Sequence, residues 1–234
     1  MLKRVLIALA VVITTAGVVS YGQQPQADEA APTLEQMRRA VSRLRGNRIA
    51  VPTNYDTLNP AQQAYVRSIL SGPRADISGP LAVMMVSPEL GDLSQKAMAY
   101  ARFAGREGFA SVMPKLNELA ILMVARHWTA NYVWNAHHNY AVQQGLPREV
   151  VDAVLAGRRP ARMDRDVAAV YDFCNEMLAV RKVSDATLQA AKAVLGGDRG
   201  VVDLVGTMGL YQITAMMVTL DQTPLGEGVK PFFP

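Results

Sequence analysis

Cysteine is nearly absent from this chain of 234 residues, which contains Cys174 alone. A single thiol cannot form an internal disulfide, so the fold must be held by its packed core. Cys174 lies in the apolar helical pattern DVAAVYDFCNEML, which predicts a small buried residue rather than a reactive one. The sequence therefore excludes a domain that depends on internal disulfide bonds.

An excess of one charge sign is also missing. Lys3 and Arg4 account for two of the 24 basic residues, so the rest of the chain has 22 basic and 20 acidic residues, a net charge of +2. The basic residues are scattered, and no nucleic-acid partner is predicted. The sequence also contains no Gly-rich phosphate loop and no Gly-x-Ser-x-Gly elbow.

The N-terminus has the pattern of a targeting segment, MLKRVLIALAVVITTAGVVS, with two basic residues before an apolar run. This predicts a signal peptide over residues 1–20 and a flexible spacer over residues 21–32. We therefore expect a periplasmic or secreted protein with no stable membrane association after cleavage. An uncleaved anchor is the alternative, because the apolar run is at the short edge for a membrane-spanning helix.

Strand patterns are absent as well, because no alternating apolar run longer than four residues occurs between the glycine and proline signals. The predicted fold class is all-α. Residues 33–70 read as an N-terminal helical extension and residues 71–234 as the main domain. The last long helical run, RGVVDLVGTMGLYQITAMMVTL, is apolar nearly all round, which predicts a central helix or a subunit contact.

The scarce residues gather in one stretch, ARHWTANYVWNAHHNYA, residues 125–141. It holds all three histidines and both tryptophans of the chain: His127, Trp128, Trp134, His137 and His138. Adjacent histidines point about 100° apart on a helix, and His127 and His138 would lie roughly 16 Å apart along it. No His-x-x-x-His or cysteine partner is present, so no metal site is predicted.

An acid–base pair is the stronger hypothesis. Glu118 lies within the apolar run NELAILMV, where a carboxylate faces solvent, is paired, or has a raised pKa. On one straight helix Glu118 and His137 would be about 28 Å apart. If the chain turns at Thr129–Asn131, the two residues face each other across a helical hairpin and form a proton-transfer unit. A solvated glutamate and a buried, hydrogen-bonded histidine remain the alternative.

The stretch NELAILMVARHWTANYVWNAHHNYAVQQGLPREVVDAVLAG resembles the carboxymuconolactone decarboxylase-like superfamily, which includes the alkylhydroperoxidase D-type (AhpD-like) proteins. The likeness covers roughly Leu70 to the C-terminus. It implies a helical bundle built around an antiparallel hairpin, assembled as a homo-oligomer (dimer, trimer or hexamer), with residues 71–234 as the family domain.

The resemblance also assigns roles to residues. The peroxidase branch carries Cys-x-x-Cys between its glutamate and histidine, and the matching positions here are Ala130 and Val133. Without that thiol pair, peroxidase chemistry is disfavoured. The decarboxylase branch needs no thiol, and Glu118 and His137 match its acid–base positions. It often has a glutamate where Val133 stands here.

The resulting expectation is a cofactor-free lyase or isomerase acting on a small organic acid or lactone, with His137 and Glu118 as its catalytic pair. Five residues are expected to contact the substrate: Arg74, His127, Tyr132, Trp134 and His138. Arg74 would pair with a substrate carboxylate, although a solvated loop cation is the plainer interpretation. A non-catalytic helical oligomer that binds a small apolar ligand is the alternative function, and peroxidase activity is a third.

Overall fold

The computed structural model describes residues 31–74, 76–103 and 112–234, and the all-α fold class is confirmed because these residues contain helices and no strand. The predicted signal peptide, residues 1–20, lies outside the described residues, as does nearly all of the predicted spacer. The helical elements are α1 (Leu34–Ser42), η1 (Tyr55–Thr57), α2 (Pro60–Leu70), α3 (Pro80–Val83), η2 (Met84–Val86), α4 (Pro88–Phe103), α5 (Pro114–His127), α6 (Asn131–Gln143), α7 (Arg148–Leu155), α8 (Arg165–Asn175), the π-helical turn η4 (Glu176–Val180), α9 (Asp185–Leu195) and α10 (Asp198–Asp221).

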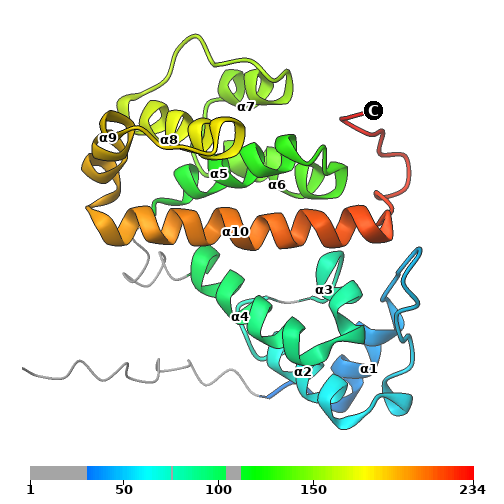
Figure 1. Cartoon of the computed structure of the whole chain (residues 1–234). Helices are drawn as coiled ribbons and strands as arrows, with labels where there is room; N and C mark the ends of the chain where they lie inside the picture. Colours follow the sequence, from blue (N-terminus) through cyan, green and yellow to red (C-terminus); the bar gives the residue numbers. More distant parts are fainter. Residues whose placement is uncertain (1–30, 75, 104–111) are drawn as a thin grey trace, which may run out of the picture. The chain divides into compact units, whose positions relative to one another are not determined.

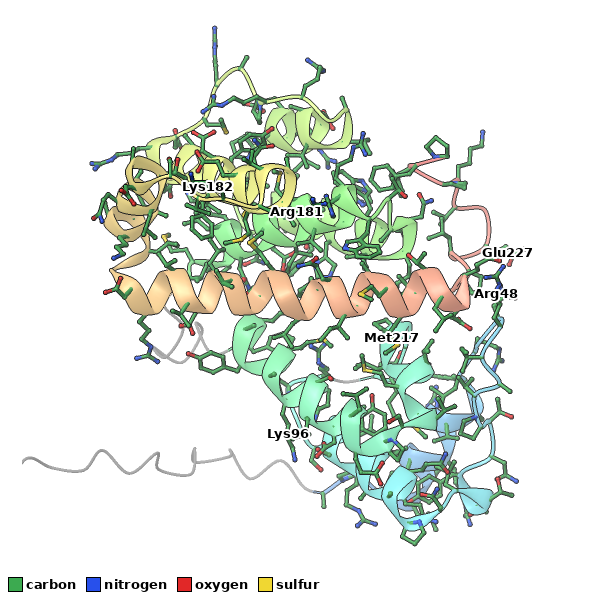
Figure 2. All side chains as sticks on the ribbon, in the orientation of Figure 1. Arg48, Lys96, Arg181, Lys182, Met217 and Glu227 are labelled. Atoms are coloured by element: carbon green, nitrogen blue, oxygen red, sulfur yellow. The ribbon has the colours of Figure 1, made fainter. Side chains whose placement is uncertain are left out.

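Helix α10 lies between helices α5 to α9 on one side and helices α1 to α4 on the other (Figure 1), and an apolar core lies on each side. The larger core is formed by α5 to α10, and the smaller by α1 to α4 with their connecting segments. Leu210 and Met217 of α10 pack against the smaller core, and Figure 2 shows Met217 on the side of α10 that faces it. The expectation that this apolar run is a central helix therefore holds.

Local sequence explains where several helices begin. Thr33 with Gln36, and Asn59 with Gln62, form capping boxes in which each side chain satisfies the other residue's backbone N–H. Proline occupies the first turn of α2 and α5, where its fixed φ suits the helix and no N–H is needed. These are the start signals that the sequence displays.

Helices α5 and α6 form a hairpin, because the chain reverses at Trp128–Ala130 and the two helices pack alongside one another. The turn is closed by the N–H of Ala130, which donates to the carbonyl of Ala125 at 2.9 Å. Thr129 has a φ of 47°, a left-handed conformation that is costly for a β-branched residue. The turn therefore accepts local strain to bring the two helices together.

One face of α10 is apolar and open to solvent. Five large side chains occur at spacings of three, four or eight residues along it and are each more than a third exposed: Val202, Val205, Ile213, Met216 and Leu220. The exposed Gly206 and Gly209 lie on the same face. By length and composition α10 could cross a membrane, the one helix to do so among the residues described, but its other faces are buried in the two cores.

Side chains of α10 and α6 hold two distant segments of the chain by hydrogen bonds to their backbone. Oδ1 of Asp221 accepts the backbone N–H groups of Asn47, Arg48 and Ile49 at 2.9, 3.0 and 2.9 Å. Figure 2 shows Arg48 beside this end of α10. Asn131 similarly accepts the N–H of Phe232 and of Phe233, at 2.6 and 2.9 Å, and so fixes the C-terminal segment on α6.

Candidate functional site

A cavity of about 140 Å³ lies between the two cores, where α3, α4, α6 and α10 meet. Its polar lining consists of Arg74, Asp76, Ser78, Arg102, Tyr132, His137, Tyr211 and Thr214, and its apolar lining of Pro80, Leu81, Met98, Val133 and Ala136. Asp76, Ser78 and Ala136 are exposed and mark the mouth. A cavity of this size accommodates a ring of about six heavy atoms.

His137 forms part of the wall, and Glu118 lies directly behind it. Nδ1 of His137 is 2.6 Å from Oε2 of Glu118, and both side chains are buried. Because a carboxylate can only accept, Nδ1 carries the proton and donates it. No hydrogen bond within the described residues occupies Nε2, which leaves that nitrogen to act on a ligand.

The environment favours a neutral imidazole. Burial lowers the pKa of His137 below its usual value; Glu118 opposes that shift, and the positive charges of Arg102 and Arg74 add to it. A neutral imidazole with Nδ1 protonated presents a lone pair on Nε2, which is the form required of a general base. The pair has the geometry and protonation of a proton-transfer unit.

Two arginines share the site. The guanidinium groups of Arg74 and Arg102 both lie over the ring of Phe103, at 5.5 and 5.1 Å from its centroid. Nη2 of Arg102 is 3.9 Å from Oε1 of Glu118, an ion pair too long to be a hydrogen bond. Burial lowers the pKa of Arg74, which remains a cation that water solvates poorly.

Two tyrosines complete the polar lining. The ring of Tyr211 meets His137 edge to face, with centroids 5.1 Å apart, and burial raises the pKa of its hydroxyl so that it stays protonated. Tyr132 packs against Gly79, where any side chain would collide with its ring and where φ is 53°. Glycine at this position therefore allows Tyr132 to reach the cavity.

The predicted site residues separate into two groups. The structure brings His137, Tyr132 and Arg74 to the cavity wall and places Glu118 behind His137. The structure places the other three residues expected to contact the substrate, His127, Trp134 and His138, outside the lining of this cavity.

The reason is the face of α6 on which each residue lies. Trp134 and His138 point to a side that the C-terminal segment covers, with Phe233 5.4 Å from the Trp134 ring and Phe232 4.9 Å from that of His138. His127 is exposed at the end of α5 against Trp128. Only part of the histidine–tryptophan stretch therefore contributes to the site.

Sequence reasoning missed Arg102, Tyr211 and Thr214. A weak signal was available, since Arg102 and Tyr211 are polar residues inside long apolar helical runs, as Glu118 is. Their residue types could not show that α4 and α10 approach α6 at those positions. In the described part of the chain, no three His, Cys, Asp or Glu side chains gather as a metal site.

Comparison with known proteins does not place the chain in a family. No family model matches it, and no curated protein matches it either.

Proposed function

We propose that this chain is an exported, cofactor-free acid–base enzyme, lyase- or isomerase-like, which acts on a small organic acid or lactone. The observation that carries the proposal is the 2.6 Å contact between His137 and Glu118 at the wall of a cavity of about 140 Å³. His137 is the general base or acid at carbon, and Glu118 orients its ring. Periplasmic or secreted localisation is part of this proposal and follows from the N-terminal sequence pattern alone.

The proposal includes membership of the carboxymuconolactone decarboxylase-like superfamily, in the branch that lacks the Cys-x-x-Cys pair. It is supported by the sequence resemblance and by the α5–α6 hairpin, which places the two motif residues in contact. In the proposed reaction Nε2 of His137 exchanges a proton with a substrate carbon next to a carbonyl group. Arg74 then faces the substrate as a cation that stabilises negative charge.

A second candidate function is the binding of a small apolar ligand without chemistry. It is favoured by the apolar part of the lining, which includes Met98 and Leu81, and by Val133, which contributes no acid to the wall. Peroxidase activity remains the third and weakest candidate. Cys174 is fully buried, and burial raises its pKa to about 12, which weighs against a reactive thiolate.

The test is proton exchange in D₂O, followed by NMR on a panel of small keto acids, unsaturated acids and lactones. The wild type should exchange or convert at least one of them. His137→Gln should reduce that rate by about 100-fold or more, since a general base contributes 10² to 10⁴. His127→Gln is the matched control, because it makes the same change at an exposed histidine outside the cavity.

Two results would decide against catalysis. If the folded wild type binds members of the panel and exchanges none, the ligand-binding function takes the lead. If His137→Gln exchanges as fast as the wild type, His137 is not the proton-transfer group. Glu118→Gln should give a smaller loss than His137→Gln, because Glu118 lies behind His137 and outside the cavity.

We also propose that a second copy of the chain covers the open face of α10 in a homo-oligomer. The exposed residues Val202, Val205, Ile213, Met216 and Leu220 run along the helix as one stripe. Together with the two glycines they present on the order of 500 Å² per copy, so two copies would bury about 1,000 Å², the lower bound for a specific interface. Two glycines in the stripe leave room for a close approach.

A further inference from the structure

The site contains hydrogen-bond donors that the acid–base pair does not use. Nε and Nη2 of Arg74 are buried and have no hydrogen-bond partner among the described residues, although Arg74 lines the cavity. A buried N–H without a partner is costly, and such groups usually mark a place where a ligand or water accepts. These two donors lie on one guanidinium and can together serve a single planar acceptor.

The charges around the cavity do not balance. Arg74 and Arg102 contribute two positive charges, Glu118 contributes one negative charge, and His137 is neutral because burial lowers its pKa. Asp76 also lines the cavity, but it is exposed at the mouth, where solvent screens its charge. Among the residues that the structure describes, the buried part of the site therefore carries one more positive than negative charge.

Tyr211 provides a further donor in the cavity wall. Its side chain lines the same cavity as Arg74 and Arg102. No hydrogen bond between Tyr211 and another described residue is formed, so the hydroxyl can donate to a ligand. Its ring touches His137 edge to face. A group bound there would lie next to the imidazole.

We propose that the cavity binds one small monocarboxylate, held by the guanidinium of Arg74 with the hydroxyl of Tyr211 as the second donor. A planar anion with one charge matches the unpaired donors and the missing charge, whereas a phosphate dianion brings more charge than the site lacks. This inference deepens the proposed function by naming the chemical class of its substrate. The binding itself requires no catalysis.

The bound anion has a consequence for His137. The groups that face this imidazole are Glu118 from α5, Arg102 from α4, Tyr211 from α10, and Arg74 and the exposed Asp76 from the segment before α3. A carboxylate on Arg74 offsets the positive field that disfavours the imidazolium. Binding should therefore raise the pKa of His137 and take up protons.

The experiment measures binding of acetate, propionate and benzoate to the purified protein, with phosphate as the comparison anion, by NMR on the His137 ring at several pH values. At least one carboxylate should bind more tightly than phosphate and raise the pKa of His137. Arg74→Gln should weaken its binding about 10-fold or more because the positive charge of the guanidinium is lost, and Tyr211→Phe about 5-fold because one donor is lost. Arg67→Gln is the matched control, an exposed arginine on α2 outside the cavity.

The outcomes separate this inference from the proposed function. Carboxylate binding that depends on Arg74 and persists in His137→Gln supports the inference, even if no substrate is converted. Conversion of neutral lactones without inhibition by any carboxylate would overturn it and leave the enzyme proposal intact. Tighter binding of phosphate, no binding by the folded protein, or equal binding in Arg74→Gln would also overturn it. Arg74→Lys keeps the positive charge but lacks the planar pair of guanidinium donors, and it should bind the carboxylate with intermediate strength.

Discussion

Nδ1 of His137 and Oε2 of Glu118 lie 2.6 Å apart although 19 positions separate them in the chain. The α5–α6 hairpin produces this contact by reversing the chain midway between the two residues. The pair is enclosed by apolar packing on the α5 side and opens to the cavity on the other. This relationship gives the first prediction.

Glu118→Gln should lower the pKa of His137 below its wild-type value. The carboxylate raises that pKa through its charge and its hydrogen bond, so its removal leaves burial and the two arginines unopposed. NMR titration of the His137 ring measures the change without any substrate. Glu149→Gln, at an exposed position on α7, is the control, and an unchanged pKa in Glu118→Gln would show that the two residues are not coupled.

Asp221→Asn should lower the free energy of unfolding by about 1–3 kcal/mol, because charged acceptors stabilise their hydrogen bonds by such amounts. Burial alone would raise the pKa of Asp221, but the donors from Ile49, Asn47, Thr223 and Arg48 reverse this and lower it below 3.8. Urea unfolding measures the difference, with the exposed Asp152→Asn as control.

The pH dependence of that difference is a separate check. Because the folded pKa lies below the unfolded one, the charged side chain of Asp221 stabilises the fold fully above pH 3.8. That stability is lost as the pH falls through the folded pKa. The difference in the free energy of unfolding between wild type and Asp221→Asn should therefore become smaller below pH 3.8. A gap that is constant or widens with acid would contradict this account.

Thr129→Gly should stabilise the protein by about 1 kcal/mol, since a left-handed conformation costs L-residues about 1–2 kcal/mol and glycine escapes most of it. Thr129 has this conformation, with a φ of 47° in the hairpin turn. Thermal unfolding compares the two proteins. Thr129→Ala is the control, because alanine removes the side chain but is still strained in the left-handed conformation. If Thr129→Ala stabilises the protein as much as Thr129→Gly does, backbone strain is not the cause.

Cys174 should not react with a thiol reagent in the folded protein and should react fully after denaturation. Its side chain is completely buried, its Sγ lies 3.7 Å from Sδ of Met208, and burial raises its pKa to about 12. Peroxide consumption should accordingly be absent. Rapid labelling of the native protein, or peroxide consumption that Cys174→Ser abolishes, would restore the peroxidase hypothesis.

Val202→Asp and Ile213→Asp should shift the protein towards a monomer in light scattering after gel filtration. Each places a charge on the exposed stripe of α10, where burial against a second copy would leave it unpaired. Val180→Asp is the matched control on η4, away from that stripe, with 62% of its residue surface exposed. A monomeric wild type at high concentration would rule out this interface, and vesicle binding would then point to a membrane.

The sequence determined the local features of this protein. Prolines and capping residues set where helices begin, and the lack of alternating runs predicted an all-α fold. Glu118 in an apolar run was recognisable as an unusual carboxylate, although the sequence left open whether it is solvated or paired. A turn near Thr129 was a hypothesis that the sequence allowed, because residues favoured at helix caps stand there. These features follow from local preferences that each segment carries with it.

Only the tertiary structure decided which of the candidate residues meet. Arg102 and Tyr211 reach the cavity because α4 and α10 pack against the hairpin, at contacts 35 and 74 residues away from His137 that no local pattern encodes. Trp134 and His138 lie outside the cavity, on a face of α6 that the C-terminal phenylalanines cover. Helix periodicity fixes the faces that side chains occupy, whereas the packing of distant apolar surfaces determines what each face contacts.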